Sequence, residues 1–305
     1  MIDNGTLGLS VEIVHESMLD ELINEFGELS FLKGLDISKD NSICWEIHGK
    51  HSYCIQAMFI GKTGYGKSTT LNKICGQELF KTDEINSCTK SLFSAEYKLD
   101  IHKNHYFSLC DLPGIGESIS ADKAYVEYYA GMLKKSHCVV YVLRADQRDY
   151  TKDHEILKLL FKTEEQKKKI VLAVNFSDKI EPVSRFSPFI PSQKQIENMD
   201  RKLHEIQKLF KIPKSNIVFY SAAEGYNLNV VVEKIAGLLK NVVQKQKELT
   251  PFEEQRRKTK EIHKMLPQHN CGDCGYKNCW SFAMAAASSN NSVSINDCHN
   301  FEEMF

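Results

Sequence analysis

The chain has 305 residues, of which 42% are hydrophobic and 26% are charged, and 39 Lys and Arg face 40 Asp and Glu. These values are typical of a soluble globular protein and exclude a disordered, collagen-like or low-complexity chain. A formal net charge of −1 excludes a global basic field that would hold nucleic acid or an acidic membrane, while a local patch stays open. At about 150 residues per domain, we expect two domains or one large domain with an appendage.

The sequence carries no signal for membrane insertion or export. Its longest apolar runs, such as residues 139–143, fall far short of the ~20 residues that span a bilayer. The first ten residues, MIDNGTLGLS, lack the basic and apolar segments of a signal peptide. We therefore expect no membrane insertion and a cytoplasmic location, where a local cluster of cysteines typically holds a metal or does redox chemistry.

The first 245 residues predict an α/β domain behind an N-terminal appendage. Apolar residues at helical spacing in 19–26 predict that residues 1–50 form a helical appendage. From 51 to 245, strands alternate with helices. The predicted strands are 53–60, 92–99, 106–112, 138–143, 170–174 and 217–220, and the predicted helices are 68–75, 123–135, 153–161, 193–210 and 230–243. This order predicts a mostly parallel central sheet flanked by helices, with one antiparallel strand from a hairpin at 92–112.

The composition changes twice beyond residue 245. Residues 246–262 are mostly charged and polar, which predicts a solvated linker or helix. Residues 263–305 are rich in Cys, Gly, Asn and Ala, and they form a predicted small second module. Within it, residues 280–287 are apolar and predict a short helix.

A phosphate-binding motif follows the predicted strand 53–60. Residues 61–68, GKTGYGKS, fit the P-loop pattern between a strand and a helix. The glycines let several backbone N–H groups face one phosphate chain, and the next helix adds the positive end of its dipole. We expect Lys67 to reach the β- and γ-phosphates and Ser68 to bind Mg²⁺. The expected nucleotide-binding residues here are Gly61, Lys62, Thr63, Gly64, Tyr65, Gly66, Lys67, Ser68 and Thr69.

Two later segments suit the metal ion and the γ-phosphate of the same nucleotide. Residues 111–114, DLPG, end a strand, where the Asp111 carboxylate can hold Mg²⁺ through water and the Gly114 N–H can face the γ-phosphate. Thr89 lies in a polar loop before the next strand, where its hydroxyl can complete the Mg²⁺ shell. A solvated loop residue is the alternative for Thr89, and the nearby P-loop favours the switch role.

Residues 175–178, NFSD, indicate which nucleotide base the site selects. An Asp178 carboxylate can accept two hydrogen bonds from the N1–H and amino group of guanine, whereas adenine offers no donors at that edge. Asn175 can tie this loop to the P-loop. Ser221 and Ala222 follow the strand 217–220, where a backbone N–H can meet guanine O6. These residues predict a site for GTP rather than ATP.

Five elements in this order resemble the P-loop GTPases and, among them, the Era/TrmE/EngA-like branch, especially its stand-alone bacterial members of the ribosome-binding type. The resemblance covers about residues 53–245 and implies GTP hydrolysis used as a switch, with Lys67 and Thr89 in catalysis. It also implies a catalytic role for Glu117, which stands where TrmE-like enzymes carry a water-orienting glutamate. The alternative for Glu117 is an acidic residue of a mobile loop without such a role.

The chain departs from this branch at three positions. Phe176 replaces the lysine of the usual Asn-Lys-x-Asp motif, which packs on the base, so Phe176 substitutes for it or base affinity is lower. Ile115 stands where Ras-like enzymes carry a water-orienting glutamine, so we expect slow intrinsic hydrolysis. Gly64 replaces the asparagine of potassium-activated relatives, which argues against potassium activation.

The C-terminal cysteines are spaced C-x2-C-x4-C, and a fourth follows after 18 residues. Four thiolates from one short segment and one return point can ligate a 4Fe–4S cluster. Residues 266–287 resemble the 4Fe–4S domain of corrinoid iron–sulfur proteins and of the Rnf electron-transport B subunit. That resemblance implies four ligands, Cys271, Cys274, Cys279 and Cys298. A structural zinc site is the rival, since His269 and His299 lie nearby.

Three functions stay open at this point. The first is a GTPase switch with Mg²⁺ whose 4Fe–4S cluster senses redox state or transfers electrons. The second is a metallocluster assembly or carrier protein that uses GTP for docking. The third is a conventional GTPase with a structural zinc tail that binds RNA or the ribosome, supported only by the charged residues 244–264. Each implies a guanine nucleotide, and the first two imply a protein partner that the sequence does not identify.

Overall fold

The computed structural model describes most of the chain. The described residues are 9–14, 16–33, 44–47, 50–82, 92–100, 105–114, 123–183, 187–247, 251–288 and 293–298. The chain divides into two compact units, Met1–Val243 and Gln244–Phe305. Within the described ranges, no helix combines the length and the apolar character needed to cross a membrane.

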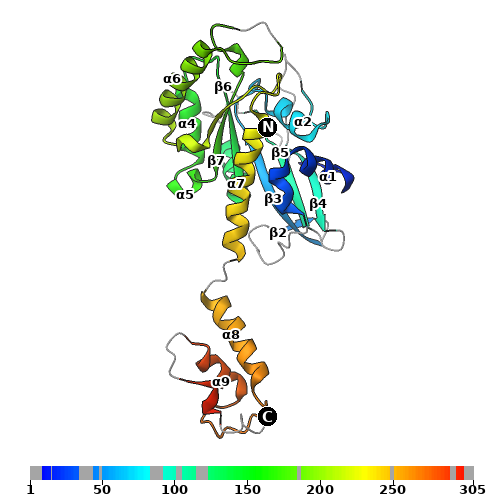
Figure 1. The fold of residues 1–305 in the computed structure, drawn as a ribbon, viewed down its shortest axis with the longest axis vertical. Helices are drawn as coiled ribbons and strands as arrows, with labels where there is room; N and C mark the ends of the chain where they lie inside the picture. Colours follow the sequence, from blue (N-terminus) through cyan, green and yellow to red (C-terminus); the bar gives the residue numbers. More distant parts are fainter. Residues whose placement is uncertain are drawn as a thin grey trace. The chain divides into compact units, whose positions relative to one another are not determined.

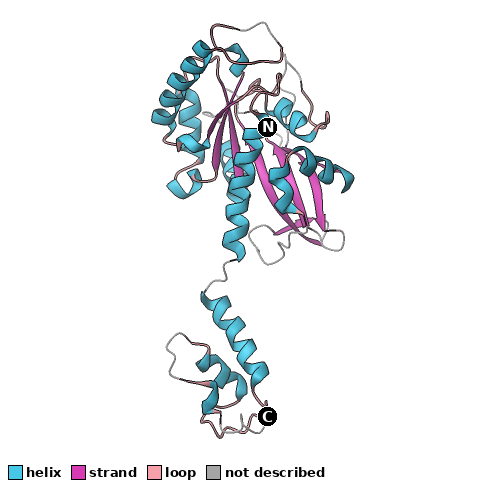
Figure 2. Ribbon diagram, in the orientation of Figure 1, coloured by secondary structure: helices cyan, strands magenta, loops and turns pink. Residues whose placement is uncertain are grey.

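The larger unit is built on one eight-stranded sheet in the described residues (Figures 1 and 2). Its strand order is β1-β4-β5-β3-β6-β7-β8, and β2 pairs with β3 outside this path. The strands are β1 Leu9–Val14, β2 Cys44–Ile47, β3 Lys50–Ile60, β4 Leu92–Asp100, β5 His105–Asp111, β6 Cys138–Arg144, β7 Ile170–Asn175 and β8 Ile217–Phe219. Only the β4–β5 and β2–β3 pairs are antiparallel among these strands. The predicted mostly parallel sheet with an antiparallel hairpin is therefore confirmed.

Helices cover both faces of this sheet. They are α1 Glu16–Glu25, α2 Lys67–Cys75, α3 Lys123–Lys135, α4 Thr151–Leu160, α5 Glu164–Lys167, α6 Gln193–Phe210 and α7 Leu228–Lys247. One buried cluster joins the sheet to α1, α2 and α7, and a second joins it to α3, α4 and α6. In β3, Ala57 and Phe59 enter the first cluster and Met58 and Ile60 the second. This alternation explains why the strand is apolar throughout, as expected of a strand buried on both faces.

Residues 1–50 are more than a helical appendage. The predicted helix is present as α1, and a 3-10 helix follows at Gly27–Leu32. In addition, β1 pairs in parallel with β4, from Leu9 opposite Leu92 to Val14 opposite Tyr97. The sequence of β1, LSVEIV, alternates apolar and polar residues, and this period of two was the signal for a strand.

The parallel strands gather the predicted motifs at one edge of the sheet. Strands β3, β5, β6, β7 and β8 all run in the same direction. The segments that follow their carboxyl ends therefore lie together, as ligand-binding loops do in open α/β sheets. These segments begin at residues 61, 112, 145, 176 and 220.

The smaller unit has its own core. It contains α8 Pro251–Met265 and α9 Cys279–Ala286, which pack together around Leu266, Phe282 and Ala283. Asn278 caps α9, since its side-chain oxygen accepts a hydrogen bond of 2.8 Å from the Ser281 N–H. The segment 246–262, predicted as a linker or helix, is thus mostly helical and belongs to this unit.

Candidate functional site

The loop after β3 has the close backbone packing that its glycines permit. Gly61 has a φ of +144°, and a Cβ there would lie 2.5 Å from the Val142 carbonyl oxygen. Gly66 has a φ of +82°, and a Cβ there would lie 2.4 Å from Asn175 Nδ2. Both positions exclude a larger side chain by conformation and by contact. The loop leads directly into the amino end of α2, which begins at Lys67. The backbone N–H groups at this end of a helix attract anions.

Lys67, the first residue of α2, turns its side chain back onto this loop. Its Nζ donates to the carbonyl oxygens of Gly61 at 3.2 Å and Lys62 at 3.3 Å. Burial lowers the pKa of Lys67, while the nearby Asp111 carboxylate raises it. An anionic ligand in the loop would supply the counter-charge that favours the ammonium form.

Ser68 and Asp111 lie in contact. The Ser68 hydroxyl donates to Asp111 Oδ2 at 2.5 Å, and Asp111 is buried at the end of β5. The segment after β5 presses on the phosphate-binding loop, because a Cβ on Gly114 would lie 2.9 Å from the Thr63 backbone nitrogen. The structure thus brings together two of the three residues predicted to hold Mg²⁺, Ser68 directly and Asp111 through water, and both present oxygen atoms, the donor type that this ion prefers.

Two predicted catalytic residues lie outside the described residues. Thr89 belongs to 83–91, and Glu117 belongs to 115–122, which also contains Ile115. Their roles therefore stay predictions from the sequence. Thr69 lies in the first turn of α2, beside Lys67 and Ser68.

Asn175 joins three loops through one side chain. Its Nδ2 donates to the Tyr65 carbonyl oxygen at 3.1 Å, which is the predicted tie to the phosphate-binding loop. Its Oδ1 accepts from the N–H groups of Ala222 at 3.0 Å and Phe176 at 2.8 Å. The Ser221 N–H donates to Tyr226 at 3.0 Å. Since both predicted donors for guanine O6 are engaged within the fold, either would have to exchange its bond to meet a base.

Asp178 has a buried carboxylate oxygen that accepts no hydrogen bond from the described residues. The residue is 7% exposed, and its Oδ1 has no hydrogen-bond partner among the described residues. Its Oδ2 lies 3.1 Å from the Lys179 ammonium. A buried acceptor without a donor costs about 1–3 kcal/mol, so a ligand with N–H donors at this position relieves the cost.

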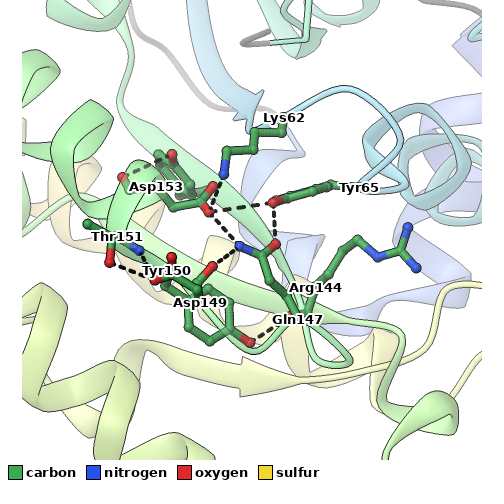
Figure 3. A network of polar contacts seen from close by, with 9 residues as sticks. Lys62, Tyr65, Arg144, Gln147, Asp149, Tyr150, Thr151 and Asp153 are labelled. Carbon is green, nitrogen blue, oxygen red and sulfur yellow. Dashed lines mark hydrogen bonds and ion pairs between the residues drawn. The ribbon is translucent and has the colours of Figure 1, made fainter. Parts of the chain in front are cut away.

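A polar network fixes the phosphate-binding loop to α4 (Figure 3). Lys62 Nζ lies 2.8 Å from Asp153 Oδ2, and the Asp153 side chain is fully buried. Tyr65 and Gln147 both hydrogen-bond to the same Asp153 oxygen, and Tyr65 also donates to Gln147. Burial raises the pKa of Asp153, whereas the Lys62 ammonium lowers it. This network could not be predicted from the sequence, because Asp153 lies 91 residues from Lys62.

The four C-terminal cysteines line one pocket. Cys279 and Cys298 are buried, Cys274 is half-buried and Cys271 is exposed at the rim. Leu266, Gly272, Asn278 and Phe282 complete the lining. The Asn270 N–H donates to the Cys279 sulfur at 3.4 Å, a contact typical of metal-bound thiolates.

This donor set fits the chemistry of an iron–sulfur cluster, which cysteine thiolates hold. Within the described ranges, no group of three or more His, Cys, Asp or Glu side chains is close enough together to hold a metal ion. The other described cysteines are different in kind. Burial raises the pKa of Cys75 to about 11 and that of Cys110 and Cys138 to about 12, as for inert core thiols.

Comparisons with protein families match both units. Residues 56–176 match the family described as "50S ribosome-binding GTPase". Residues 266–299 match the family described as "Putative Fe-S cluster". The first match lies across the loops after β3, β5 and β6, and the second includes all four cysteines of the pocket.

Individual relatives resemble the larger unit. The protein YfjP of Escherichia coli is 28% identical over 204 residues, which are 67% of this chain and 69% of YfjP. GTPase Der of Leptospira interrogans is 26% identical over 185 residues, which are 60% of this chain but only 33% of Der. A solved structure of chloroplast translocon components, for whose GTPase activity dimerization is important, has a TM-score of 0.50 at 17% identity. It covers 74% of this chain and 91% of its own, which shows a common fold.

Proposed function

We propose that the chain is a P-loop GTPase of the Era/EngA-like kind with a C-terminal Fe–S module, and that it works as a guanine-nucleotide switch with a redox-active cluster; the two family matches and the similarity to GTPase Der support this. In this proposal the chain binds GTP with Mg²⁺, hydrolyses it slowly and couples its nucleotide state to a 4Fe–4S cluster. The buried Asp178 oxygen without a described partner is the observation that supports guanine as the base.

The phosphate end of the site is formed by α2 and the loop before it. The Lys67 ammonium and the backbone N–H groups neutralise the phosphate oxygens. Ser68 and, through water, Asp111 would hold Mg²⁺, and this ion would supply positive charge at the phosphates. Thr89 and Glu117 are proposed to complete the metal shell and to orient the attacking water. The missing glutamine at position 115 supports slow hydrolysis.

The base end of the site is formed by the loops after β7 and β8. Asp178 accepts from the N1–H and the amino group of guanine, and Asn175 holds this loop against the phosphate-binding loop. Adenine leaves the Asp178 oxygen unsatisfied, so ATP is rejected by the cost of a buried unpaired acceptor. The same loops therefore bind the nucleotide and select its base.

The C-terminal pocket would hold the cluster through Cys271, Cys274, Cys279 and Cys298, and a bound 4Fe–4S cluster supplies one-electron chemistry. Leu266 and Phe282 exclude water from one side of the pocket. The Asn270 N–H stabilises negative charge on the Cys279 sulfur. We propose that the cluster senses redox state or transfers electrons to a protein partner.

Phosphate release from GTP tests the nucleotide switch. With the full chain and Mg²⁺, we expect slow release from GTP, none from ATP and a loss of release in Lys67→Ala. Asp178→Asn is expected to shift preference from GTP to xanthosine triphosphate, because an amide N–H then meets the xanthine oxygen. Identical release by the unchanged chain and Lys67→Ala would overturn the proposal.

Metal analysis of anaerobically purified protein tests the cluster. We expect about four irons and four sulfides per chain, with a matching absorption and EPR spectrum. Cys271→Ala should lose this iron, while Cys75→Ala, which changes a half-buried thiol of the larger unit, should keep it. Stoichiometric zinc without sulfide would overturn the cluster. A change of GTP turnover on reduction supports the switch, whereas transfer of iron to an acceptor during turnover would favour the carrier alternative.

A further inference from the structure

A row of three oxygen atoms connects the end of β8 to the phosphate-binding loop. Thr70 Oγ1 lies 2.8 Å from the Tyr220 hydroxyl oxygen and 2.7 Å from the Gly66 carbonyl oxygen. Thr70 belongs to the first turn of α2, and Tyr220 follows the last residue of β8. Both residues are fully buried, although 150 positions separate them in the sequence. The nucleotide contacts proposed above use neither of these side chains.

The hydrogen bonds in this row have one direction. A carbonyl oxygen can only accept, so the Thr70 hydroxyl donates its single proton to Gly66. The Tyr220 hydroxyl must then donate to Thr70 Oγ1. Burial raises the pKa of Tyr220, so the phenol keeps the proton that it donates. Because hydrogen bonds in a chain polarise one another, the Tyr220 proton strengthens the bond from Thr70 to Gly66.

The backbone of Tyr220 is fixed against the end of β7. Its N–H donates to the Val174 carbonyl oxygen at 2.9 Å, and its own carbonyl oxygen accepts from the Ser177 N–H at 3.1 Å. Val174 lies in β7, and Ser177 lies in the loop that follows this strand. The Tyr220 hydroxyl therefore reaches α2 from a backbone position that two hydrogen bonds hold in place.

Two consecutive peptide groups of the phosphate-binding loop are held from this side. The Asn175 amide donates to the Tyr65 carbonyl oxygen at 3.1 Å, and Thr70 donates to the next carbonyl, that of Gly66. In a planar trans peptide, the N–H points in the opposite direction to the C=O. A bond that fixes the Gly66 carbonyl therefore also fixes the Lys67 N–H, at the amino end of α2 where an anion binds.

From this geometry we infer that Tyr220 is a positioning residue whose hydroxyl, acting through Thr70, orients the Lys67 N–H toward the phosphate groups of the nucleotide. The inference rests on the proposed nucleotide site. The hydroxyl itself acts without touching the nucleotide. It contributes to phosphate binding, whereas the Asp178 carboxylate selects the base. Loss of the hydroxyl should consequently weaken the binding of nucleoside diphosphates without changing the preference among bases.

Calorimetric titration of the full chain with GDP and inosine diphosphate, in the presence of Mg²⁺, tests this role. Tyr220→Phe removes one oxygen atom and keeps the ring. It should raise the Kd of both nucleotides by the same factor, about three- to tenfold, as expected for one hydrogen bond. Their ratio should not change, because inosine differs only in the amino group that guanine offers to Asp178. In the GDP complex, the NMR signal of the Lys67 amide proton should move upfield, since a less polarised peptide donates a weaker bond.

Tyr97→Phe is the matched control. Tyr97 is buried in the same hydrophobic cluster as Tyr220, and its hydroxyl donates to the Cys75 sulfur at 3.0 Å. Cys75 is the last residue of α2, at the end away from the phosphate-binding loop. Both substitutions remove a buried tyrosine hydroxyl that bonds to α2, so both should lower the melting temperature. Only Tyr220→Phe should change the Kd of GDP.

Substitutions at Thr70 test the row of hydrogen bonds itself. Thr70→Ser keeps the hydroxyl and should keep the Kd of GDP. Thr70→Val keeps the shape without the hydroxyl and should raise the Kd at least as much as Tyr220→Phe. When Tyr220→Phe is added to Thr70→Val, the Kd should not rise further. The melting temperature should then increase, because in Thr70→Val alone the Tyr220 hydroxyl is buried without its acceptor.

Four results would overturn the inference. The first is an unchanged Kd of GDP in Tyr220→Phe, and the second is an equal rise of the Kd in Tyr97→Phe. The third is a changed ratio between GDP and inosine diphosphate in Tyr220→Phe, which would place the effect at the base. The fourth is an equal effect of Tyr220→Phe with and without the Thr70 hydroxyl. Failure of the unchanged chain to bind GDP would instead contradict the proposed nucleotide site.

Discussion

Single buried polar side chains hold the candidate nucleotide site together. Asp153 fixes the phosphate-binding loop through Lys62, Tyr65 and Gln147, and Asn175 fixes the base loops. In a low-dielectric interior, such groups are costly when one partner is removed, because the remaining partner stays buried without its hydrogen bond. Changes at these residues therefore separate loop positioning from direct ligand contact.

Asp153→Asn keeps the shape of the side chain and removes its charge. Lys62 then loses the buried carboxylate that balances its charge. We therefore expect the free energy of unfolding to fall by about 2–4 kcal/mol. Urea denaturation measures this change. Glu165→Gln breaks the exposed pair with Lys168 and should cost less than about 1 kcal/mol. An equal effect of the two substitutions would contradict a structural role for the buried pair.

Asn175→Ala removes the amide that joins three loops. The Tyr65 carbonyl and the Ala222 N–H lose their shared partner, so we expect GDP affinity to fall at least tenfold and stability by about 1–3 kcal/mol. Calorimetric titration with GDP and thermal unfolding measure the two effects. Asn198→Ala, an exposed amide that bonds to the Glu181 carbonyl, is the control and should change neither.

Among the secondary-structure elements, strand β4 contains a buried acidic residue, Glu96. Glu96 is 8% exposed, and burial raises its pKa, while a hydrogen bond with Ser94 lowers it by less. The neutral form is thus favoured in the folded state. Because the folded chain binds this proton more tightly than the unfolded chain, the contribution of Glu96 to stability falls as pH rises above the usual range near 4.

Glu96→Gln removes this titration. We expect the variant to match the original chain near pH 4 and to become relatively more stable as the pH rises through the raised pKa of Glu96. Urea unfolding at a series of pH values between 4 and 8 measures the difference. Glu155→Gln, an exposed acid on α4, should show no such trend. A difference that is constant across the pH range would contradict the assignment.

The elements that could be predicted from the sequence are those whose local pattern of apolar and polar residues matches the burial of the element. Strands β6 and β7 read as short apolar runs because both of their faces are buried, and α6 shows a strong capping box at Ser192. Strand β2 escaped prediction because its four residues carry no clear alternation. The Arg144–Phe176 and Lys62–Asp153 contacts could not be predicted either. They depend on how separate strands pair, and a short stretch of sequence does not show that pairing.

At the scale of the whole molecule, the two units have separate hydrophobic cores. Among the residues that the structure describes, the cluster around Phe282 consists of residues of the smaller unit, and the two clusters of the sheet consist of residues of the larger one. We expect units with separate cores to unfold in separate transitions, in which case a single melting temperature does not describe the chain.

Phe282→Ala tests this separation. The loss of a fully buried ring should destabilise the smaller unit by about 3–5 kcal/mol. Scanning calorimetry should show one transition that falls in temperature and one that stays, and added GDP should raise the latter. Val140→Ala in the sheet should show the opposite pattern. A fall of both transitions in Phe282→Ala would contradict independent cores.

The pairing of β1 with β4 also has a consequence for the order of events during translation. Leu9 lies opposite Leu92, so the first strand has no partner until more than 80 further residues have left the ribosome. At roughly 5–20 residues per second, this delay lasts on the order of ten seconds. During this delay, a segment with alternating apolar residues is exposed in the nascent chain, where a chaperone can bind it. The end strand β1 is therefore made well before the strand β4 with which it pairs.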